Sequence, residues 1–488
     1  MKLHDALEAI GFHADACPAV EAAGVTEDSR KVSRGDVFVA VMGGHADGHD
    51  FAASAAASGA VAVLGDRPGL RELAGLPYLY APAVRETAAR LAHRLAGDPT
   101  ERLTVIGITG TNGKSSTAML ARAMLQESGR ATSLFGTLGY DIGNTHVPAP
   151  HTTPFGDELA RMMQRAIEAG DTHVVMEVSS HALDQERVAG IRFRGAAFTN
   201  LTQDHLDYHV SMEAYRDAKL KLFRRVEGEG AFTAINREDP ASPAFLEASA
   251  GRTIAYGEGG AIRARSVKHG AGGSRFTLET PDGQADVALR LIGEHNVQNA
   301  LCAAAIGHGL GLDPGAIARG LGRLDRVPGR FDAVDGGQDF FVIVDYAHTE
   351  DGLVNVLRAA RPLCRGRIIT VFGCGGDRDR GKRPKMGRAA GQLSDFCVLT
   401  SDNPRSEDPC RILLDVEVGL QRAGRKKGED YVVIESREKA IHHAIGLARP
   451  GDLVMIAGKG HEDYQILADR TIHFDDREVA LEALGGLR

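Results

Sequence analysis

The chain has 488 residues, and at roughly 150 residues per domain this length predicts about three domains. Hydrophobic residues make up 43% and charged residues 25%, values that exclude collagen-like, coiled-coil and wholly disordered proteins. The 57 basic and 65 acidic residues give a net charge of −8, which argues against nonspecific binding to nucleic acid or to anionic membranes.

The cysteines and the amino-terminal segment indicate the compartment. The 6 cysteines are scattered and form no C-x-x-C pair, so they predict neither a disulfide framework nor a zinc ribbon. Asp5 and Glu8 lie where a signal peptide needs its apolar stretch, and no run of about 18 apolar residues occurs. We therefore expect reduced thiols, a cytoplasmic location and no membrane contact.

Residues 1–98 alternate short apolar runs with Ala-rich helical stretches. This pattern predicts a small α/β domain that ends at the Gly97-Asp98-Pro99 break. Its expected elements are strands over 37–41, 60–64 and 76–82 and helices over 51–59 and 84–97.

Residues 99–328 are predicted to form a central domain. Long apolar runs without polar alternation, separated by helices, are typical of a mostly parallel sheet covered on both faces. The expected elements are strands over 103–110 and 173–178, helices over 116–129 and 293–311, and an irregular, β-rich segment over 228–290.

Residues 329–488 contain five apolar strands that alternate with helices, which predicts a doubly wound, Rossmann-like domain. The predicted fold class is therefore α/β with three domains, a P-loop-type central sheet lying between the small first domain and this last one. The five strands are expected over 340–347, 366–373, 396–404, 431–436 and 452–458.

A glycine-rich loop follows the strand over 103–110 and opens the next helix. Its small residues let backbone N–H groups converge on phosphate oxygens, Lys114 can reach the outer phosphates, and the Ser115 hydroxyl can bind Mg²⁺. The strict P-loop pattern requires Gly at position 108, where this chain has Ile. The ligand is expected to be ATP or GTP. The predicted contacts are Gly110, Thr111, Asn112, Gly113, Lys114, Ser115 and Ser116.

Acidic and imidazole side chains follow other predicted strands. Glu177 ends the strand over 173–178, so its carboxylate is expected to face the crevice that holds the nucleotide. A hard cation there would take oxygens from Ser115 and Glu177, with phosphates and waters completing the shell. His205 stands beside Asp204 and is a further candidate, whereas His209 is interpreted as a surface or capping histidine.

Together these motifs resemble the Mur ligase family, ATP-dependent amide-forming enzymes of bacterial cell-wall synthesis. The loop of this family, G-x-x-G-T-x-G-K-[ST], is satisfied from Gly107 to Ser115 and accounts for Ile108. The other motif residues stand in the same order along the chain, as Glu177, His205, His295, Asn296, Asn299, Arg330, Asp345 and His348.

The resemblance implies roles for several of these residues. Lys114, Glu177, His205 and Lys219 would be catalytic, with Lys219 carbamylated by CO₂. A carbamate supplies an anionic oxygen to Mg²⁺, which an ammonium repels. The metal ligands would be Ser115, Glu177, His205 and Lys219, and Asn299, Arg330, Asp345 and His348 would contact ATP. From the residues alone, a solvated helix face accounts for Lys219, and Lys221 is an equally good candidate.

Within this family, the motifs resemble those of enzymes that add meso-diaminopimelate to UDP-N-acetylmuramoyl-L-alanyl-D-glutamate. The muramoyl dipeptide would be bound by Ser29, Thr152, Thr153, Ser179, Gln185 and Arg187. The segment over 43–48 departs from the family pattern just before Ala46, so the uridine contact that we predict is Ser29 rather than Gly44 or His45.

The sequence D-N-P-R at 402–405 is the pattern of diaminopimelate-adding members. A guanidinium such as that of Arg405 pairs bidentately with a carboxylate that lysine lacks, which would favour diaminopimelate. Taken alone, the same four residues are an ordinary Asx-Pro turn. The implied diaminopimelate contacts are Arg378, Asp402, Asn403, Pro404, Arg405, Gly458 and Glu462.

The implied reaction passes the γ-phosphoryl group of ATP to the D-glutamate carboxylate, and the amino group of diaminopimelate then displaces phosphate. Because the implied contacts come from three domains, we expect the domains to close when substrates bind. The protein is expected to be a monomer. The resemblance also implies a role in cell shape and division. The alternatives are a lysine-adding relative, a folylpolyglutamate synthetase and a GTPase-like switch. The chain has no N-K-x-D motif with which a switch would read guanine.

Overall fold

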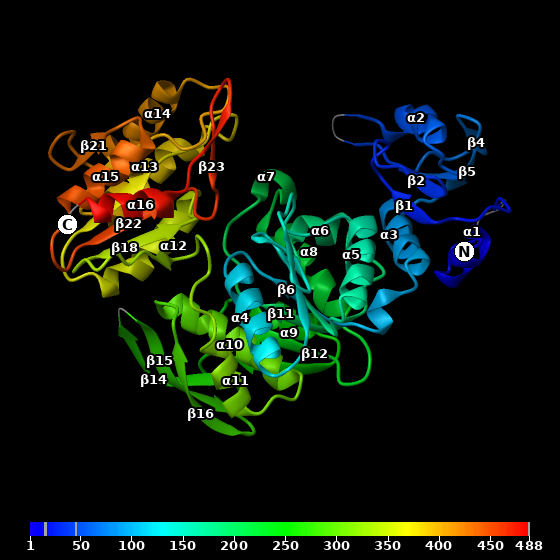
Figure 1. The fold of residues 1–488 in the computed structure, drawn as a ribbon, viewed down its shortest axis with the longest axis horizontal. Helices are drawn as coiled ribbons and strands as arrows, with labels where there is room; N and C mark the ends of the chain where they lie inside the picture. The colour runs from blue at the N-terminus through cyan, green and yellow to red at the C-terminus, as the bar shows by residue number, and fades with distance from the viewer. Residues whose placement is uncertain (14–16, 44–45, 271, 487–488) are drawn as a thin grey trace. The chain divides into compact units, whose positions relative to one another are not determined.

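A computed structural model of the protein describes residues 1–13, 17–43, 46–270 and 272–486, and Figure 1 shows their fold. Contacts within the chain divide it into two compact units. The first comprises Met1–Ala264, Leu278–Ala285 and Asn299–Leu321, and the second comprises Arg265–Thr277, Asp286–Gln298 and Gly322–Arg488.

The amino-terminal part of the first unit is a five-stranded sheet in the order β1-β2-β3-β5-β4. Val37 and Val39 of β2 pack with α1 and α3, whereas Phe38 and Ala40 pack with α2 on the opposite face. The predicted small α/β arrangement is therefore confirmed. Its elements are β1 (Gly24–Thr26), β2 (Asp36–Ala40), β3 (Ala62–Gly65), β4 (Glu72–Leu73), β5 (Leu76–Tyr80), α1 (Leu3–Ala9), α2 (Ala52–Ala57) and α3 (Val84–Leu95).

The rest of the first unit is built on an eight-stranded sheet in the order β13-β12-β11-β6-β10-β7-β8-β9. Neighbours from β13 to β7 pair in parallel, whereas β8 and β9 pair antiparallel, so the prediction of a mostly parallel sheet is confirmed. The strands are β6 (Thr104–Thr109), β7 (Thr132–Gly136), β8 (Gly139–Ile142), β9 (Thr145–Val147), β10 (His173–Glu177), β11 (Phe193–Phe198), β12 (Phe232–Asn236) and β13 (Arg252–Tyr256).

Helices cover this sheet, and one buried cluster joins β10 and β11 to α5 and α8. The first helix begins at Lys114 rather than at the predicted Ser116, because Lys114 and Ser115 of the phosphate loop already form its first turn. The helices are α4 (Lys114–Glu127), α5 (Gly156–Glu168), α6 (Ser180–Asp184), α7 (Leu206–His209), α8 (Met212–Arg224), α9 (Ser242–Ala248), α10 (Glu294–Gly309) and α11 (Pro314–Leu321).

The segment over 228–290 is rich in β-structure, as predicted, but it divides between two sheets. β12 and β13 are regular strands that extend the central parallel sheet. Their short apolar runs contain too few residues to be told from loop segments by pattern. The remaining strands, β14 (Arg263–Gly270), β15 (Gly273–Thr280) and β16 (Gly283–Leu289), form a separate three-stranded sheet.

The second unit contains a six-stranded sheet in the order β17-β18-β22-β19-β20-β21. All five predicted strands are present and pair in parallel, and the short β17 (Asp332–Ala333) joins β18 antiparallel. The five are β18 (Phe341–Asp345), β19 (Ile368–Phe372), β20 (Phe396–Leu399), β21 (Tyr431–Val433) and β22 (Leu453–Ala457).

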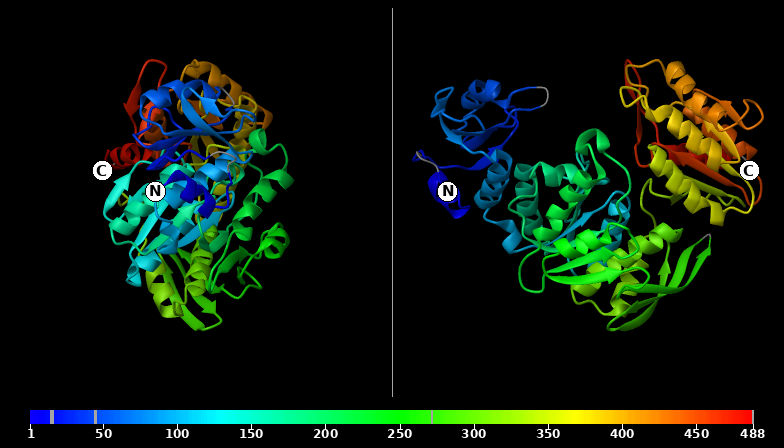
Figure 2. Two further views of the ribbon diagram at one scale, coloured as in Figure 1. Left: turned by 90° about the vertical axis from the view of Figure 1, so that its right-hand side faces the viewer. Right: turned by 180° about the vertical axis from the view of Figure 1, so that it is seen from behind.

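Two buried clusters cover opposite faces of this sheet. Ile343 and Phe372 pack with α12, α13 and α14, whereas Val342 and Val371 pack with α15 and α16. Figure 2 shows the sheet, yellow to red, with helices on either side. The predicted doubly wound architecture is confirmed. Its other elements are α12 (Glu350–Ala360), α13 (Lys382–Leu393), α14 (Pro409–Arg422), α15 (Arg437–Leu447), α16 (Asp476–Gly485), β23 (Tyr464–Ile466) and β24 (Thr471–His473).

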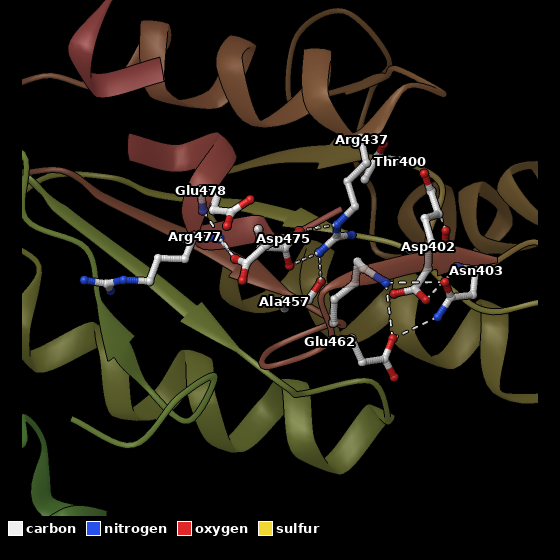
Figure 3. Close-up of polar contacts among 12 residues, drawn as sticks. Thr400, Asp402, Asn403, Arg437, Ala457, Glu462, Asp475, Arg477 and Glu478 are labelled. Carbon is white, nitrogen blue, oxygen red and sulfur yellow. Dashed lines mark hydrogen bonds and ion pairs between the residues drawn. The ribbon is translucent and has the colours of Figure 1, made fainter. Parts of the chain in front are cut away.

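A fully buried ion pair ties α15 to α16. The Arg437 guanidinium donates to both carboxylate oxygens of Asp476 at 2.7 Å, and it also donates to the Ala457 carbonyl at 3.0 Å. Figure 3 shows Arg437 reaching toward Ala457 at the end of β22. The pair therefore anchors two helices to the carboxyl end of a central strand.

Breaking this pair from one side should strongly destabilise the protein. We expect Arg437→Met to lower the free energy of unfolding by about 3–5 kcal/mol, because it leaves the Asp476 charge buried without its partner. Urea denaturation measures the change. Arg470→Met removes a guanidinium from an exposed pair with Asp469 and should have little effect. Equal losses in the two variants would contradict the buried pair's role.

All 6 cysteines lie within the described ranges and are free thiols. Across those ranges, no helix combines the length and the apolar character needed to cross a membrane.

Candidate functional site

Candidate residues of the first unit gather at the carboxyl ends of neighbouring parallel strands. β10 and β11 flank β6 on its two sides, and the phosphate loop leaves the end of β6. In an open α/β sheet, the crevice beyond these ends is the usual position for a ligand. The topology therefore brings Glu177 and the segment after β11 to the loop, as the sequence predicts.

The loop depends on two glycines that sit against other parts of the site. Gly110 has φ +150°, and a Cβ there would lie 1.8 Å from the hydroxyl oxygen of Thr199. Gly113 has φ +83°, and a Cβ there would lie 2.3 Å from Oδ1 of Asn299 in α10. The packing thus joins the predicted nucleotide contact Asn299 to the loop and leaves no space for a side chain at either glycine.

Adding one methyl group at Gly113 should disable the loop. We expect Gly113→Ala to weaken ATP binding at least about 10-fold, because the new methyl collides with Asn299 and the positive φ strains alanine. Isothermal titration with ATP measures the affinity. Gly129→Ala is the matched control, since Gly129 has φ +76° but nothing within 4 Å of its Cβ position. Equal loss of ATP affinity in both variants would contradict the steric explanation.

Two lysines converge on the same backbone oxygen of this loop. Nζ of Lys114 donates to the Gly110 carbonyl at 2.9 Å, and Nζ of Lys219 donates to it at 3.0 Å. Lys219 is 1% exposed and lies 4.3 Å from the ring centroid of Tyr215. Burial, and next the charge of Lys114, lower the pKa of Lys219 well below its usual value.

The structure separates the two lysines that the sequence leaves equivalent. Lys221 is one-third exposed, and its Nζ lies 3.1 Å from the carboxylate of Glu186 and 3.8 Å from that of Asp184. Lys219, in contrast, faces the loop and forms no ion pair with a carboxylate in the described part of the chain. Lys219 is therefore the one of these two lysines that contacts the phosphate loop.

Glu177 is buried at the end of β10, and a neighbouring loop fixes its carboxylate. Oε1 accepts the backbone N–H of Thr137 at 2.9 Å, and Oε2 accepts the Thr137 hydroxyl at 3.2 Å. Gly136 permits this approach, since a Cβ there would lie 2.3 Å from Oε1. Glu177 and Ser115 both contribute oxygen donors after adjacent strands, which is the donor type that Mg²⁺ prefers.

His205 and Asp204 follow β11 at the same edge of the sheet. His205 has φ +55°, its side chain is 46% exposed, and Nδ1 lies 3.6 Å from the Asp204 carboxylate. Its ring centroid lies 4.8 Å from that of His181, and His209 is buried with Nε2 3.0 Å from the Ser180 hydroxyl. His209 is therefore buried and bonded to Ser180. The interpretation of His209 as a surface histidine is wrong.

These donors suit a cation that is held partly by phosphate. Within the described ranges, no three His, Cys, Asp or Glu side chains are grouped as ligands of a metal ion. Ser115 and Glu177 supply oxygen donors of the type that Mg²⁺ takes, and phosphates and waters would fill the rest of its shell.

Most of the predicted dipeptide contacts form one hydrogen-bonded group beside Glu177. The Thr153 hydroxyl donates to the Glu177 carbonyl at 2.9 Å and accepts the Ser179 N–H at 3.0 Å. Arg187 donates to the Thr153 carbonyl at 2.9 Å and to Oε1 of Gln185 at 2.7 Å. The structure thus joins Thr153 to Ser179, Gln185 and Arg187, a group that begins 26 positions later in the sequence.

Thr152 and the amino-terminal sheet adjoin this group. The hydroxyls of Thr152 and Thr137 lie 3.0 Å apart. Arg187 lines a small cavity together with Glu27 from the segment after β1, and burial raises the pKa of Glu27. Ser29 is half-buried two positions after Glu27, and no hydrogen bond joins it to Thr153 or Arg187 in the described part of the chain. Gly44 and His45 lie outside the described residues.

In the second unit, candidate residues again follow the carboxyl ends of parallel strands. Asp345 ends β18, and its carboxylate accepts the N–H groups of Phe331 at 2.7 Å and Ala347 at 2.8 Å. Burial raises the pKa of Asp345, while Arg330 opposes this effect. The Arg330 guanidinium lies 4.7 Å from the ring centroid of Tyr346, and His348 is exposed with Nδ1 2.8 Å from the Tyr346 carbonyl.

The predicted diaminopimelate contacts lie together after β19, β20 and β22. Asn403 donates from Nδ2 to Glu462 at 2.9 Å, and a Cβ at Gly458 would lie 2.6 Å from the Asp402 carboxylate. Figure 3 shows Asp402, Asn403 and Glu462 side by side. Asn403 is 3% exposed, and Asp402 is 8% exposed. The loop after β20 is thus a packed structure rather than an isolated turn.

Two arginines complete this group. Arg405 has φ +54°, and its Nη1 donates to the Gly376 carbonyl at 2.9 Å. A Cβ at Gly375 would lie 2.9 Å from Nη1 of Arg405 and 4.0 Å from Cγ of Arg378. Arg378 itself is exposed, and Pro404 is buried. The glycines before Arg378 therefore leave room for both side chains.

Sequence reasoning did not identify several residues that organise these sites. Thr137 fixes Glu177 but follows a short strand without any motif. Lys459 is fully buried between Gly458 and Glu462, and its position within G-K-G-H-E is a signal that could have drawn attention to it. Arg437 reads as a surface residue of a helix, and only the fold reveals that it is buried.

Comparison with known families gives matches along most of the chain. Three family models match successive segments: "Mur ligase family, catalytic domain" over 21–96, "Mur ligase middle domain" over 108–307 and "Mur ligase, glutamate ligase domain" over 329–460. The three segments agree with a three-domain organisation, whereas the boundaries at 98 and 328 stay predictions.

Individual relatives share the same name. Proteins of Syntrophomonas wolfei and Solibacter usitatus named UDP-N-acetylmuramoyl-L-alanyl-D-glutamate--2,6-diaminopimelate ligase are each 46% identical over 469 residues, covering 96% of this chain and 95% and 94% of those proteins. A solved structure of a ligase with that name is 31% identical, with a TM-score of 0.72 and coverage of 100% and 99%. The similarity to the solved structure thus spans the whole chain, including every candidate residue.

Proposed function

Because this chain belongs to the Mur ligase family, we propose that it joins meso-diaminopimelate to UDP-N-acetylmuramoyl-L-alanyl-D-glutamate with hydrolysis of ATP to ADP and phosphate. The observation that carries the proposal is the 46% identity, over 96% of the chain, to relatives named for these two substrates. The reaction belongs to the synthesis of peptidoglycan precursors, and we place it in the bacterial cytoplasm.

The phosphate loop supplies the first part of this mechanism. Its backbone N–H groups and Lys114 would hold the ATP phosphates, which directs the γ-phosphoryl group toward the acceptor carboxylate. Mg²⁺ bound by Ser115, Glu177, His205 and the phosphates would neutralise charge that develops on the transferred group. Thr137 holds the Glu177 carboxylate at both oxygens, so this ligand is oriented before substrates bind.

The group around Arg187 is suited to the acidic end of the acceptor. Its guanidinium is held by Gln185 and Thr153, so its position is fixed. Its Cζ atom also lies 4.1 Å from the ring centroid of Phe155. A fixed guanidinium that binds a carboxylate places the reacting group of the D-glutamate residue beside the loop. Attack by the amino group of diaminopimelate on the acyl phosphate then forms the amide and releases phosphate.

The proposal includes a carbamate on Lys219. The family resemblance implies it, and the burial of Lys219 against the Gly110 carbonyl supports it, since a carbamate at that position would bring oxygen donors to the loop. The residues of the second unit implied to contact ATP, namely Arg330, Asp345 and His348, stay part of the proposal, as do the monomeric state and closure on substrate binding.

Phosphate release and product mass test the proposed reaction. The purified chain is incubated with ATP, Mg²⁺, the UDP-muramoyl dipeptide and either diaminopimelate or lysine. We expect phosphate and a UDP-tripeptide only with diaminopimelate. Release with lysine instead would reverse the amino-acid specificity, and release with neither from folded protein would contradict ligation.

Two other candidates are separated in the same assay. A folylpolyglutamate synthetase would extend a folate with glutamate, and a GTPase-like switch would prefer GTP and form no amide. The D-N-P-R segment and the matched segment over 21–96 favour the muramoyl substrate over a folate. Product formation from a folate, or hydrolysis of GTP in preference to ATP, would therefore replace the proposed function.

A further inference from the structure

The ammonium group of Lys459 is buried inside the candidate amino-acid site. Lys459 is 0% exposed, and its Nζ lies 3.2 Å from Oε2 of Glu462 and 3.3 Å from Oδ1 of Asn403. It also lies 5.4 Å from the ring centroid of Tyr464. A buried ammonium requires partners that offset its lost hydration, and here both polar partners are predicted contacts of diaminopimelate.

Lys459 and Asn403 hold the same oxygen of the Glu462 carboxylate. Oε2 accepts from Nζ of Lys459 and from Nδ2 of Asn403 at 2.9 Å, whereas Oε1 accepts no hydrogen bond in the described part of the chain. Figure 3 shows the second oxygen of Glu462 pointing away from these donors. One oxygen is therefore fixed within the protein, and the other is left to accept from an ammonium ligand.

The same ammonium fixes the side-chain amide of Asn403. Oδ1 of Asn403 accepts from Lys459 and from the backbone N–H of Ile466 at 2.9 Å, which directs Nδ2 toward Glu462. The adjoining backbone is also held, because Gln465 donates to the Asp402 carbonyl at 2.6 Å. Lys459 thus contacts both members of a pair whose orientations depend on each other.

We propose that Lys459 is a positioning residue for the incoming amino acid, which presents the free oxygen of Glu462 and the amide of Asn403 to diaminopimelate. This inference rests on the proposed function. Without the ammonium, the Glu462 carboxylate loses one of its two donors and the Asn403 oxygen loses one of its two, so both groups can rotate. The loss should therefore affect binding of the amino acid and leave the nucleotide and the UDP-linked acceptor largely unaffected.

Lys459→Met, which keeps an unbranched side chain one atom shorter and removes the ammonium group, tests the proposal. We expect KM for diaminopimelate to rise at least about 20-fold, with KM for ATP and for the acceptor within about twofold of wild type. Lys439→Met is the matched control, since Lys439 is exposed in the neighbouring α15. Thermal melting records the stability of each variant.

A double-mutant cycle asks whether Lys459 acts through Glu462. If it does, Lys459→Met should change KM for diaminopimelate by less than about threefold in a Glu462→Gln background. If Lys459→Met does not fold, Lys459→Gln replaces it, because glutamine keeps a hydrogen-bond donor without the charge. KM for diaminopimelate should rise in this variant too. The thermal melting data then show whether a change in KM comes from a less stable fold or from the loss of positioning.

The results distinguish this inference from the proposed function. A wild-type protein that ligates no diaminopimelate would contradict the proposed function. A wild-type protein that ligates it, with variants at Lys459 whose KM for diaminopimelate is unchanged or rises together with the other two KM values, would overturn the positioning role.

Discussion

Lys219→Ala should lower the rate of ligation at least about 100-fold, because the site would lose an oxygen ligand for Mg²⁺ at the transferring phosphoryl group. The side chain is buried and donates to the Gly110 carbonyl of the phosphate loop, so the change acts directly at the nucleotide. High bicarbonate should not restore the activity, since alanine has no amine to carbamylate. The steady-state rate of phosphate release measures the effect.

Lys221→Ala is the matched control for this experiment. Lys221 lies in the same helix, but it is one-third exposed and paired with Glu186, so its loss should change the rate by less than about threefold. In addition, ¹³C-bicarbonate should give a carbamate signal in the NMR spectrum of wild type and of Lys221→Ala, and none from Lys219→Ala. Near wild-type activity of Lys219→Ala would remove Lys219 from the metal site.

Arg405→Lys should lower kcat/KM for diaminopimelate roughly 30- to 100-fold, as expected for the loss of a charged, bidentate hydrogen bond. Nη1 of Arg405 is held by the Gly376 carbonyl, whereas Nε and Nη2 have no acceptor in the described part of the chain. These two groups can together bind one carboxylate. A lysine side chain keeps the charge and loses the fork.

The backbone and the competing substrate supply the controls for Arg405. Lysine is no better suited than arginine to φ +54°, so backbone strain is the same in both proteins. Arg411→Lys changes an exposed arginine in α14 and should leave kcat/KM unchanged. The ratio of kcat/KM for diaminopimelate to that for lysine should fall in Arg405→Lys. An unchanged ratio would assign the selection to other residues.

Strand order could not be predicted from the sequence, although the strands themselves could. Apolar runs such as 366–373 and 452–458 identify buried strands because both of their faces are covered by helices. Nothing in these runs shows that β22 pairs with both β18 and β19, since pairing depends on contacts between distant segments. The short β12 and β13 were missed as members of the central sheet for the same reason.

Some residues of the candidate site could likewise be predicted from the sequence, whereas others could not. Lys114, Glu177 and Arg405 belong to motifs whose spacing along the chain carries the chemistry, so they could be named from the sequence. The choice between Lys219 and Lys221 needed burial and partners. The G-K-G-H-E segment could have drawn attention to Lys459, but its contacts needed the fold, because its partner Asn403 lies 56 positions away in the sequence.

The position of β22 also determines when the carboxy-terminal sheet can form during synthesis. β22 lies between β18 and β19, so a nascent chain must hold these two strands apart until residue 457 has left the ribosome. Until then, one edge of each strand presents unpaired backbone N–H and C=O groups that are open to other chains. The pairing of β22 with both β18 and β19 is therefore a late step in the assembly of this sheet.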